Sequence, residues 1–264
     1  MPIADNNTYK TNPERRRSLL SKIFLSPKFM FYPQIIWIFW INGRRALKGV
    51  YDDTAWAESS FDVLKTLENI GLRIEITGME HIHEADGPVV FVGNHMSTLE
   101  TLVLPCIVQP VKTTTFVVKK SLVDMPVFGP VMRSREPILV GRTNPREDLK
   151  TVIEQGTEKI RNGKSIIIFP QSTRSIIFNP TDFNSLGIKL AVRSGVPVIP
   201  IAIKTDAWGV GKLFKDFGPI DLNKKAYLSF GAPIHIRGRG AEEHKAVIRF
   251  IRDNLEKWKE GDVA

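Results

Sequence analysis

His95 and Glu100 are residue types that carry proton-transfer chemistry, and they stand five positions apart, directly after the apolar run Val89–Val92. A neutral imidazole can take a proton from a hydroxyl, and a carboxylate at its other ring nitrogen fixes the tautomer and stabilises the imidazolium that forms. The same stretch also matches a capping box, with Ser97 as N-cap and Glu100 at N3, in which Glu100 only begins a helix. At this point both interpretations stay open.

The elements that must position these residues follow an alternating pattern. Short β-prone runs are separated by segments with helical spacing, which predicts an α/β fold with a mostly parallel central sheet flanked by helices. The expected strands are Leu72–Thr77, Val89–Val92, Thr113–Val118, Ile138–Val140, Ser165–Phe169, Val198–Ile203 and Ala226–Phe230. The expected helices are Thr54–Asn69, Asn144–Gly163, Ser185–Ser194 and Ala241–Lys259.

Charged residues follow several of these strands at the point where each one ends. His95 follows one strand, and the cations that follow the others are Lys119, Lys120, Arg142, Arg174 and Lys204. In sheets of this class, ligands bind beyond the carboxyl ends of the strands. Solvent exposure would explain one such cation, whereas positively charged residues at several strand ends predict a binding site for a phosphate group.

The overall charge narrows the class of partner. The chain has 264 residues and a formal net charge of +9, which suits a phosphorylated small molecule, nucleic acid, an anionic membrane surface or an acidic carrier protein. Nucleic acid is not expected, because no recognition motif is present. The single cysteine, Cys106, excludes an internal disulfide and fits a reducing compartment. His81 and His83 lack the ligand pattern of a zinc site, so no metal is expected.

The N-terminal segment combines aromatic and basic residues. The apolar stretch Phe29–Ile41 is interrupted by Pro33 and is shorter than the about 20 residues that a membrane-spanning helix needs. Its composition matches a helix lying in the membrane interface, although a core helix is the alternative. The expected docking residues are Phe31, Trp37, Phe39 and Trp40, and the flanking cations are Arg15, Arg16, Arg17, Lys22, Lys28, Arg44, Arg45 and Lys48. We therefore expect a docking segment over residues 1–53 and an α/β domain over residues 54–264.

Four short motifs, in order, resemble those of the glycerolipid acyltransferase family, which includes the 1-acylglycerol-3-phosphate acyltransferases. Asn94-His95 and Glu100 are similar to the family's N-H-x4-D motif, with Glu in place of Asp. The regions similar to the other three motifs are Lys119–Leu122 with Met125–Gly129 and Arg142, then Phe169–Ser175 (FPQSTRS against F-P-E-G-T-R-S), then Val196–Pro200. Each motif is weak singly, and the ordered set is specific.

The resemblance implies transfer of a fatty acyl group from acyl-CoA or acyl carrier protein to the hydroxyl of a lysophospholipid, above all 1-acylglycerol-3-phosphate, to give phosphatidate. His95 would be the general base and Glu100 its charge partner. The acceptor phosphate would contact Lys119, Arg142, Gln171, Ser172, Thr173 and Arg174, with Thr173 supporting Arg174. The acyl chain would lie in an apolar groove. The donor would be a substrate, no cofactor is implied, and the enzyme would work at the cytoplasmic face of a membrane.

One departure from the family pattern bears on the acceptor. Gln171 and Ser172 replace Glu-Gly, which removes a negative charge beside Arg174 and puts the headgroup in question more than the reaction. Two alternatives therefore stay open: a catalytically silent lipid- or anion-binding protein on the same fold, and an acyltransferase for another acceptor such as lyso-ornithine lipid. Acyl donor, chain length and oligomeric state are not fixed by the sequence.

Overall fold

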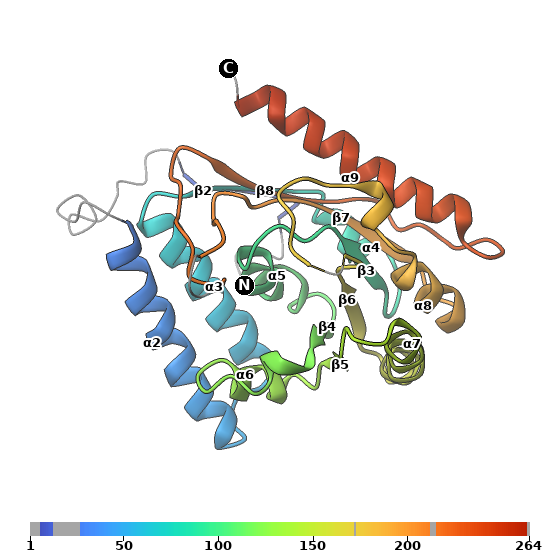
Figure 1. Cartoon of the computed structure of the whole chain (residues 1–264), viewed down its shortest axis with the longest axis horizontal. Helices are drawn as coiled ribbons and strands as arrows, with labels where there is room; N and C mark the ends of the chain where they lie inside the picture. Colours follow the sequence, from blue (N-terminus) through green and yellow to red (C-terminus); the bar gives the residue numbers. More distant parts are fainter. Residues whose placement is uncertain (1–5, 13–26, 172, 212–214, 263–264) are drawn as a thin grey trace.

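The structure is a computed structural model that describes residues 6–12, 27–171, 173–211 and 215–262 (Figure 1). Its strands are β1 (Thr8–Lys10), β2 (Arg73–Thr77), β3 (Val90–Gly93), β4 (Thr114–Lys119), β5 (Ile138–Val140), β6 (Ser165–Ile168), β7 (Val198–Lys204) and β8 (Lys225–Phe230). Its α-helices are α2 (Pro27–Leu47), α3 (Asp53–Asn69), α4 (Glu80–Glu84), α5 (Leu99–Val108), α6 (Gly129–Ser134), α7 (Pro145–Arg161), α8 (Leu186–Ser194) and α9 (Ala241–Asp262). Two 3-10 turns, η1 (Lys120–Leu122) and η2 (Pro180–Asp182), complete the described elements.

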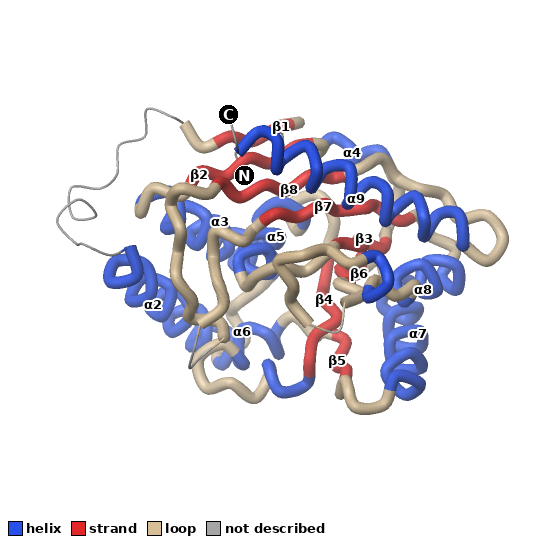
Figure 2. Tube along the Cα trace, turned by 45° about the horizontal axis from the view of Figure 1, so that its top comes forward, coloured by secondary structure: helices blue, strands red, loops and turns tan. Residues whose placement is uncertain are grey.

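The strands form one eight-stranded sheet in the order β1-β2-β8-β7-β3-β6-β4-β5. Figure 2 shows its strong twist, from β2 and β8 at one end to β4 and β5 at the other. The sheet is mixed, because β1 pairs antiparallel with β2 and β7 pairs antiparallel with β8. The α/β class is confirmed, and the sheet is mostly but not wholly parallel, with antiparallel pairings at β1–β2 and at β7–β8.

The parallel group is the part of the sheet that carries the predicted chemistry. β7, β3, β6, β4 and β5 are consecutive neighbours and run in the same direction. Their carboxyl ends therefore meet at one edge, where residues 94–95, 119, 141–142, 169–171, 173–174 and 204–205 emerge. The reversed strand β8 lies outside this group, so it does not change which residues meet at the edge.

Helices cover both faces of the sheet, as the alternation of buried side chains along each central strand requires. In β3, Phe91 packs with α3 and α5, whereas Val90 and Val92 pack with α7, α8 and α9. Ile167 and its neighbours in β6 divide in the same way. Figure 1 shows α2 lying outside α3, at the margin of the helical layer that contains α3 and α5.

Most helix ends follow the local signals in the sequence. The Asn144 side chain accepts hydrogen bonds from the backbone N–H groups of Arg146 and Glu147 and so caps α7, as expected. Gly195 ends α8 in the left-handed conformation, with φ of 68°. The edge strand β1 was not expected because, unlike β5, its sequence Thr-Tyr-Lys contains no apolar run, and the six residues of α6 span fewer than two helical turns and show no periodicity.

Candidate active site

The strand end after β3 is fixed to its neighbour β7 by a side chain. Asn94 Nδ2 donates to the carbonyl of Ile203 at 2.7 Å, and the Ile203 N–H donates to Asn94 Oδ1 at 2.9 Å. These two bonds continue the ladder beyond the last backbone pair, Gly93 with Ile201. Asn94 thereby fixes where the next residue, His95, leaves the sheet.

His95 and Glu100 lie together at this strand end. His95 Nδ1 is 2.8 Å from Glu100 Oε1, and the side chains are 13% and 0% exposed. Because the carboxylate accepts a hydrogen bond from Nδ1, the lone pair that can take a proton is on Nε2. One face of the imidazole packs against Phe169, whose ring stacks on it at a centroid distance of 4.6 Å and an interplanar angle of 9°.

Glu100 accepts five hydrogen bonds, which satisfy both oxygens. Oε1 accepts from His95 Nδ1 and from the backbone N–H groups of Met96 at 2.7 Å and Ser97 at 2.9 Å. Oε2 accepts from the hydroxyls of Thr205 at 2.6 Å and Ser97 at 3.0 Å. Burial alone raises the pKa of this carboxyl, but the bonds and charge of His95, together with Thr205 and Ser97, outweigh burial and hold the pKa below its ordinary value.

The two sequence interpretations of Glu100 are therefore compatible. Glu100 reaches back to the Ser97 N–H, and the Ser97 hydroxyl accepts from the backbone N–H of Leu99 at 3.1 Å, as in a capping box. The helix itself begins at Leu99, so Thr98 and not Ser97 is the residue that precedes its first turn. The carboxylate orients the turn and faces the imidazole at the same time. Thr205 was missed by the sequence analysis, because it lies 105 positions from Glu100 and no local pattern joins them.

The segment after β6 wraps around the backbone of His95. Gln171 is buried, and its side-chain oxygen accepts from the His95 N–H at 2.7 Å. The N–H of Ser175 donates to the His95 carbonyl at 2.9 Å. The contact made by Gln171 is thus with the histidine, whereas its role toward a phosphate stays a prediction. Ser172 lies outside the described residues.

Arg174 is held by residues other than the expected one. Its Nη1 is 2.7 Å from Asp216 Oδ1 and donates to the Thr98 hydroxyl, whereas Thr173 is exposed. The expectation that Thr173 supports Arg174 is therefore corrected. Asp216 nevertheless places a negative charge beside Arg174, from a loop that is distant in the sequence.

The other predicted cations divide between the site and the protein body. Partial burial lowers the pKa of the Arg142 guanidinium, Asp148 raises it, and the charge of Arg174 lowers it further, so the two guanidinium groups share one electrostatic environment. Lys119 and Arg142 line the same cavity as His95. Lys204 instead is buried and pairs with Asp206 at 3.3 Å.

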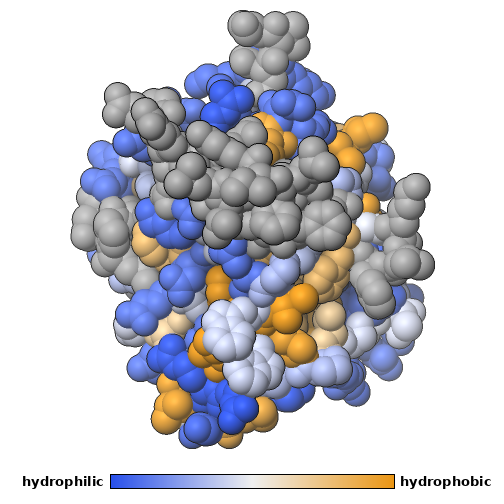
Figure 3. All heavy atoms as spheres, turned by 90° about the vertical axis from the view of Figure 1, so that its left-hand side faces the viewer, coloured by the Kyte–Doolittle hydropathy of each residue, from blue (hydrophilic) through white to orange (hydrophobic). Residues whose placement is uncertain are grey.

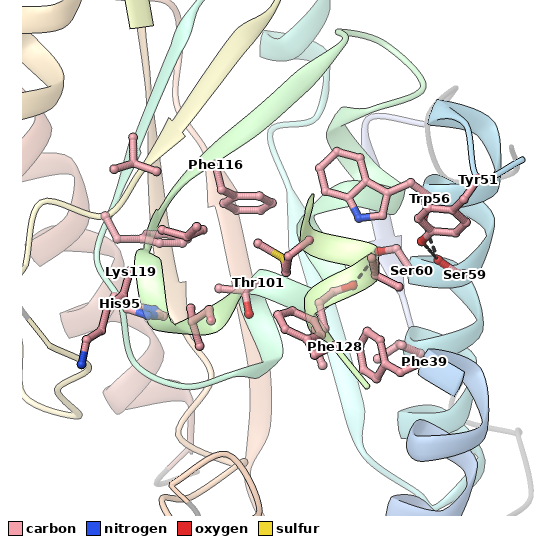
Figure 4. A pocket seen from close by; sticks show the side chains of 18 of the residues that line it. Phe39, Tyr51, Trp56, Ser59, Ser60, His95, Thr101, Phe116, Lys119 and Phe128 are labelled. Atoms are coloured by element: carbon pink, nitrogen blue, oxygen red, sulfur yellow. Dashed lines mark hydrogen bonds between the residues drawn. The ribbon is translucent and has the colours of Figure 1, made fainter. Parts of the chain in front are cut away.

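An apolar cavity of about 90 Å³ leads away from His95. Figure 4 shows His95 and Lys119 at one end and Trp56 and Tyr51 at the other, with Phe116 between them. The remaining walls come from α2, α3, α5, α6, β4, η1 and the loops beside them. They are lined by Phe39, Ser59, Ser60, Val63, Thr101, Leu102, Val117, Val118, Leu122, Phe128, Val131, Met132, Arg142 and Phe169. The arrangement can hold an alkyl chain with its reactive end at the imidazole.

The expected docking residues lie on two different faces of α2. Trp37 and Trp40 are 58% and 44% exposed and stack on each other at 5.2 Å, and Arg44 lies over the Trp40 ring. Phe31 is fully buried and Phe39 packs edge-on against Phe128, so the expectation for these two is corrected. The reason is geometric: residues 31, 35 and 39 repeat at the helical period and face the core.

The outer face of α2 is apolar in its middle and basic at its end. With the two tryptophans, it exposes Ile36, Ile41 and Leu47. Figure 3 shows pale and orange side chains gathered on this side of the molecule, below atoms drawn in grey. None of the helices in the described ranges is both long and apolar enough to cross a bilayer. The upstream cations Arg15, Arg16, Arg17 and Lys22 lie outside the described residues.

Comparison with known proteins identifies the family. A family model described as Acyltransferase matches residues 73–204. The 1-acyl-sn-glycerol-3-phosphate acyltransferase of Pseudomonas aeruginosa is 36% identical over 188 residues, which cover 71% of this chain and 68% of that protein. The protein of the same name from Escherichia coli is 30% identical over 122 residues, which cover 46% of this chain and 49% of that protein.

A solved structure has the same fold. The crystal structure of the 1-acyl-sn-glycerophosphate acyltransferase PlsC from Thermotoga maritima superimposes with a TM-score of 0.64 at 23% sequence identity, over 88% of this chain and 95% of that one. The family model covers the strands from β2 to β7, and with them His95, Glu100 and the cations at the strand ends, whereas Thr205 and Asp216 lie beyond it. With the histidine, the carboxylate and the cations in that region, this chain belongs to the acyltransferase family.

Proposed function

We propose that the protein moves a fatty acyl group from a thioester donor, acyl-CoA or acyl carrier protein, to the free hydroxyl of 1-acylglycerol-3-phosphate, giving phosphatidate. The observation that carries this proposal is the position of His95 between a buried carboxylate, which its ring contacts, and the apolar cavity, which it lines. The names of the relatives from Pseudomonas aeruginosa and Escherichia coli support the choice of acceptor.

In the proposed mechanism, His95 Nε2 takes the proton of the acceptor hydroxyl while its oxygen attacks the thioester carbonyl. An oxygen–carbon bond forms, the carbon–sulfur bond breaks, and the imidazolium returns the proton to the departing thiolate. Glu100 stabilises the imidazolium through Nδ1, and its depressed pKa keeps it ionised for this task. No covalent acyl-enzyme is needed, and Cys106 is an unsuitable nucleophile because burial raises its pKa to about 12.

The acceptor phosphate is assigned to Arg174, Arg142 and Lys119. Two guanidinium groups within each other's field repel, so a dianion between them gains from both charges. The acyl chain of the donor is assigned to the cavity between His95 and Trp56. A volume of about 90 Å³ is below the about 300 Å³ of typical ligand pockets, so a long chain requires the lining side chains to move.

Membrane association is part of the same proposal. A lysophospholipid and its product reside in a bilayer, and Trp37 and Trp40 with Arg44 form the aromatic and basic surface that an interfacial helix presents to lipid. The lone buried Cys106 suits a reducing compartment, which favours the cytoplasmic face.

The test is acyl transfer by purified protein in detergent, with acyl-CoA and acyl carrier protein as donors and a panel of lyso-acceptors. We expect product from 1-acylglycerol-3-phosphate and a loss of turnover in His95→Ala, with folding retained. His235→Ala, a substitution of another histidine, is the matched control. Product only from a different acceptor would reassign the headgroup. Lipid binding without turnover from any pair would favour the catalytically silent alternative.

A further inference from the structure

Asp216 contacts Arg174 in the candidate phosphate site, and the proposed reaction gives this carboxylate no role. Its Oδ1 is 2.7 Å from Arg174 Nη1 and accepts a hydrogen bond from the Thr98 hydroxyl at 2.9 Å. Arg174 Nη1 also donates to Thr98, so the three groups form a closed triangle. Thr98 stands two residues before Glu100, at the beginning of α5, which joins this triangle to the same turn that carries the proposed base.

The backbone around Asp216 is firmly built. Trp208 Nε1 donates to the Asp216 carbonyl at 3.2 Å, and the Tyr32 hydroxyl of α2 donates to the Gly218 carbonyl at 2.6 Å. Gly209 and Gly218 approach so closely that a Cβ on Gly218 would stand 1.7 Å from the Gly209 oxygen. These contacts hold the backbone of residues 216–218 against Trp208, Gly209 and α2.

The contact engages one end of the guanidinium. Arginine has five N–H donors in a rigid planar fork. The contacts of Arg174 with the described residues are at Nη1, which leaves the Nη2 and Nε donors for a ligand. Two contacts at one nitrogen, with Asp216 and with Thr98, restrict rotation of the planar group and so restrict the direction in which Nη2 and Nε point. Asp216 can therefore hold the fork in place without occupying the donors that would bind a phosphate.

We propose that Asp216 is a positioning residue that orients Arg174 toward the phosphate of the acceptor. This inference rests on the proposed function for the identity of the ligand. The opposite role, a carboxylate that competes with the phosphate for Arg174, would require the anion to displace Asp216. Retention and displacement have opposite effects on acceptor affinity, so one measurement separates them.

The experiment compares wild-type protein with Asp216→Ala and Asp216→Asn in the full chain. The amide of Asn keeps an acceptor oxygen for Thr98 and Arg174 but not the charge. The pair is partly exposed, at 20% for Arg174 and 33% for Asp216, so screening moderates the effect. In Asp216→Ala we expect the KM for 1-acylglycerol-3-phosphate to rise roughly five- to tenfold, because a charge-assisted bond is lost. Asp216→Asn should give a smaller rise.

Three readouts identify a positioning role. The kcat and the KM for the acyl donor should stay within about twofold of wild type, and Asp216→Ala should add nothing to Arg174→Ala in a double-mutant cycle. Asp253→Asn, an exposed acid on α9, is the control for general charge effects. A fall in acceptor KM would overturn the proposal in favour of competition. An unchanged KM would also overturn it, and a rise in donor KM alone would assign Arg174 to the donor.

Direct binding keeps this inference separate from the proposed function. If wild-type protein turns over no acceptor, the proposed function fails, and equilibrium dialysis with labelled 1-acylglycerol-3-phosphate in detergent still decides the role of Asp216. Weaker binding in both Asp216 variants supports positioning, and equal or tighter binding refutes it. If Asp216→Ala does not fold, the isosteric Asp216→Asn carries the decision alone.

Discussion

Replacing Glu100 by Gln separates the charge of this side chain from its packing. The two oxygens face different donors: backbone and ring N–H groups at Oε1, and the hydroxyls of Ser97 and Thr205 at Oε2. N–H groups require an oxygen, whereas hydroxyls can rotate and accept from an amide. The glutamine therefore fits in one orientation, with its oxygen toward His95 and its NH2 toward the hydroxyls, and the turn is retained.

The expected loss follows from the distance between the pair. Unit charges about 4 Å apart attract by about 4 kcal/mol at an effective dielectric constant of ~20, and His95 Nδ1 lies 2.8 Å from Glu100 Oε1. Loss of between about a third and all of this attraction would raise the barrier of a step that passes through the imidazolium by about 1.4 to 4 kcal/mol. We therefore expect kcat/KM to fall by about 10- to 1000-fold, with His95→Ala more severe.

The assay is initial-rate acyl transfer in detergent, with thermal unfolding of the same preparations. Glu68→Gln is the matched control, because Glu68 is also buried and accepts from the hydroxyls of Tyr9 and Thr11 on the far side of the fold. It should lose stability without losing turnover. If Glu100→Gln stays within about threefold of wild type, Glu100 only begins helix α5, and the assignment of an acid–base pair is refuted.

Three further outcomes follow from the same geometry. The folded-state pKa of Glu100 is depressed, so its charge stabilises the protein fully above the ordinary value of 4.5, and this contribution is lost as pH falls through the folded pKa. The free energies of unfolding of wild type and Glu100→Gln, measured in urea, should therefore converge below the folded pKa and separate above it. Met132→Ala should enlarge the cavity, shift kcat/KM toward longer acyl-CoA chains and cost about 2 to 5 kcal/mol of stability, and an unchanged chain-length profile would contradict the cavity assignment. Trp37→Glu with Trp40→Glu should lower sedimentation with anionic vesicles by about tenfold or more while detergent activity is retained, and unaltered sedimentation would contradict docking through α2.

Local signals in the sequence determined most of the secondary structure. Asn144 caps α7 and Gly195 ends α8 because the residues that satisfy or release a helix end are neighbours in the chain. The apolar runs of the central strands predicted their own burial on both faces. The proximity of His95 and Glu100 was also within reach, since a strand end, a tight turn and a helix start confine residues five positions apart.

The sequence was a poorer guide to which face of a helix is buried and to the direction in which a strand runs. Helix α2 is apolar around most of its circumference, so its periodicity could not tell the buried Phe31 from the exposed Trp37. The antiparallel pairing of β8 was missed for a related reason, because strand direction depends on the path of the connection and leaves no mark on the strand itself.

The groups that complete the site were decided by tertiary structure alone. Thr205 reaches Glu100 across 105 positions, and Thr98 reaches Asp216 across 118. Both contacts exist because β7 lies beside β3 and the loop after it folds back against α2. The sequence by itself determined which residue types stand at the strand ends, since hydrophobic burial fixes where each strand stops. Which distant hydroxyl or carboxylate meets them depends on strand order and loop closure, and these are properties of the packed chain as a whole.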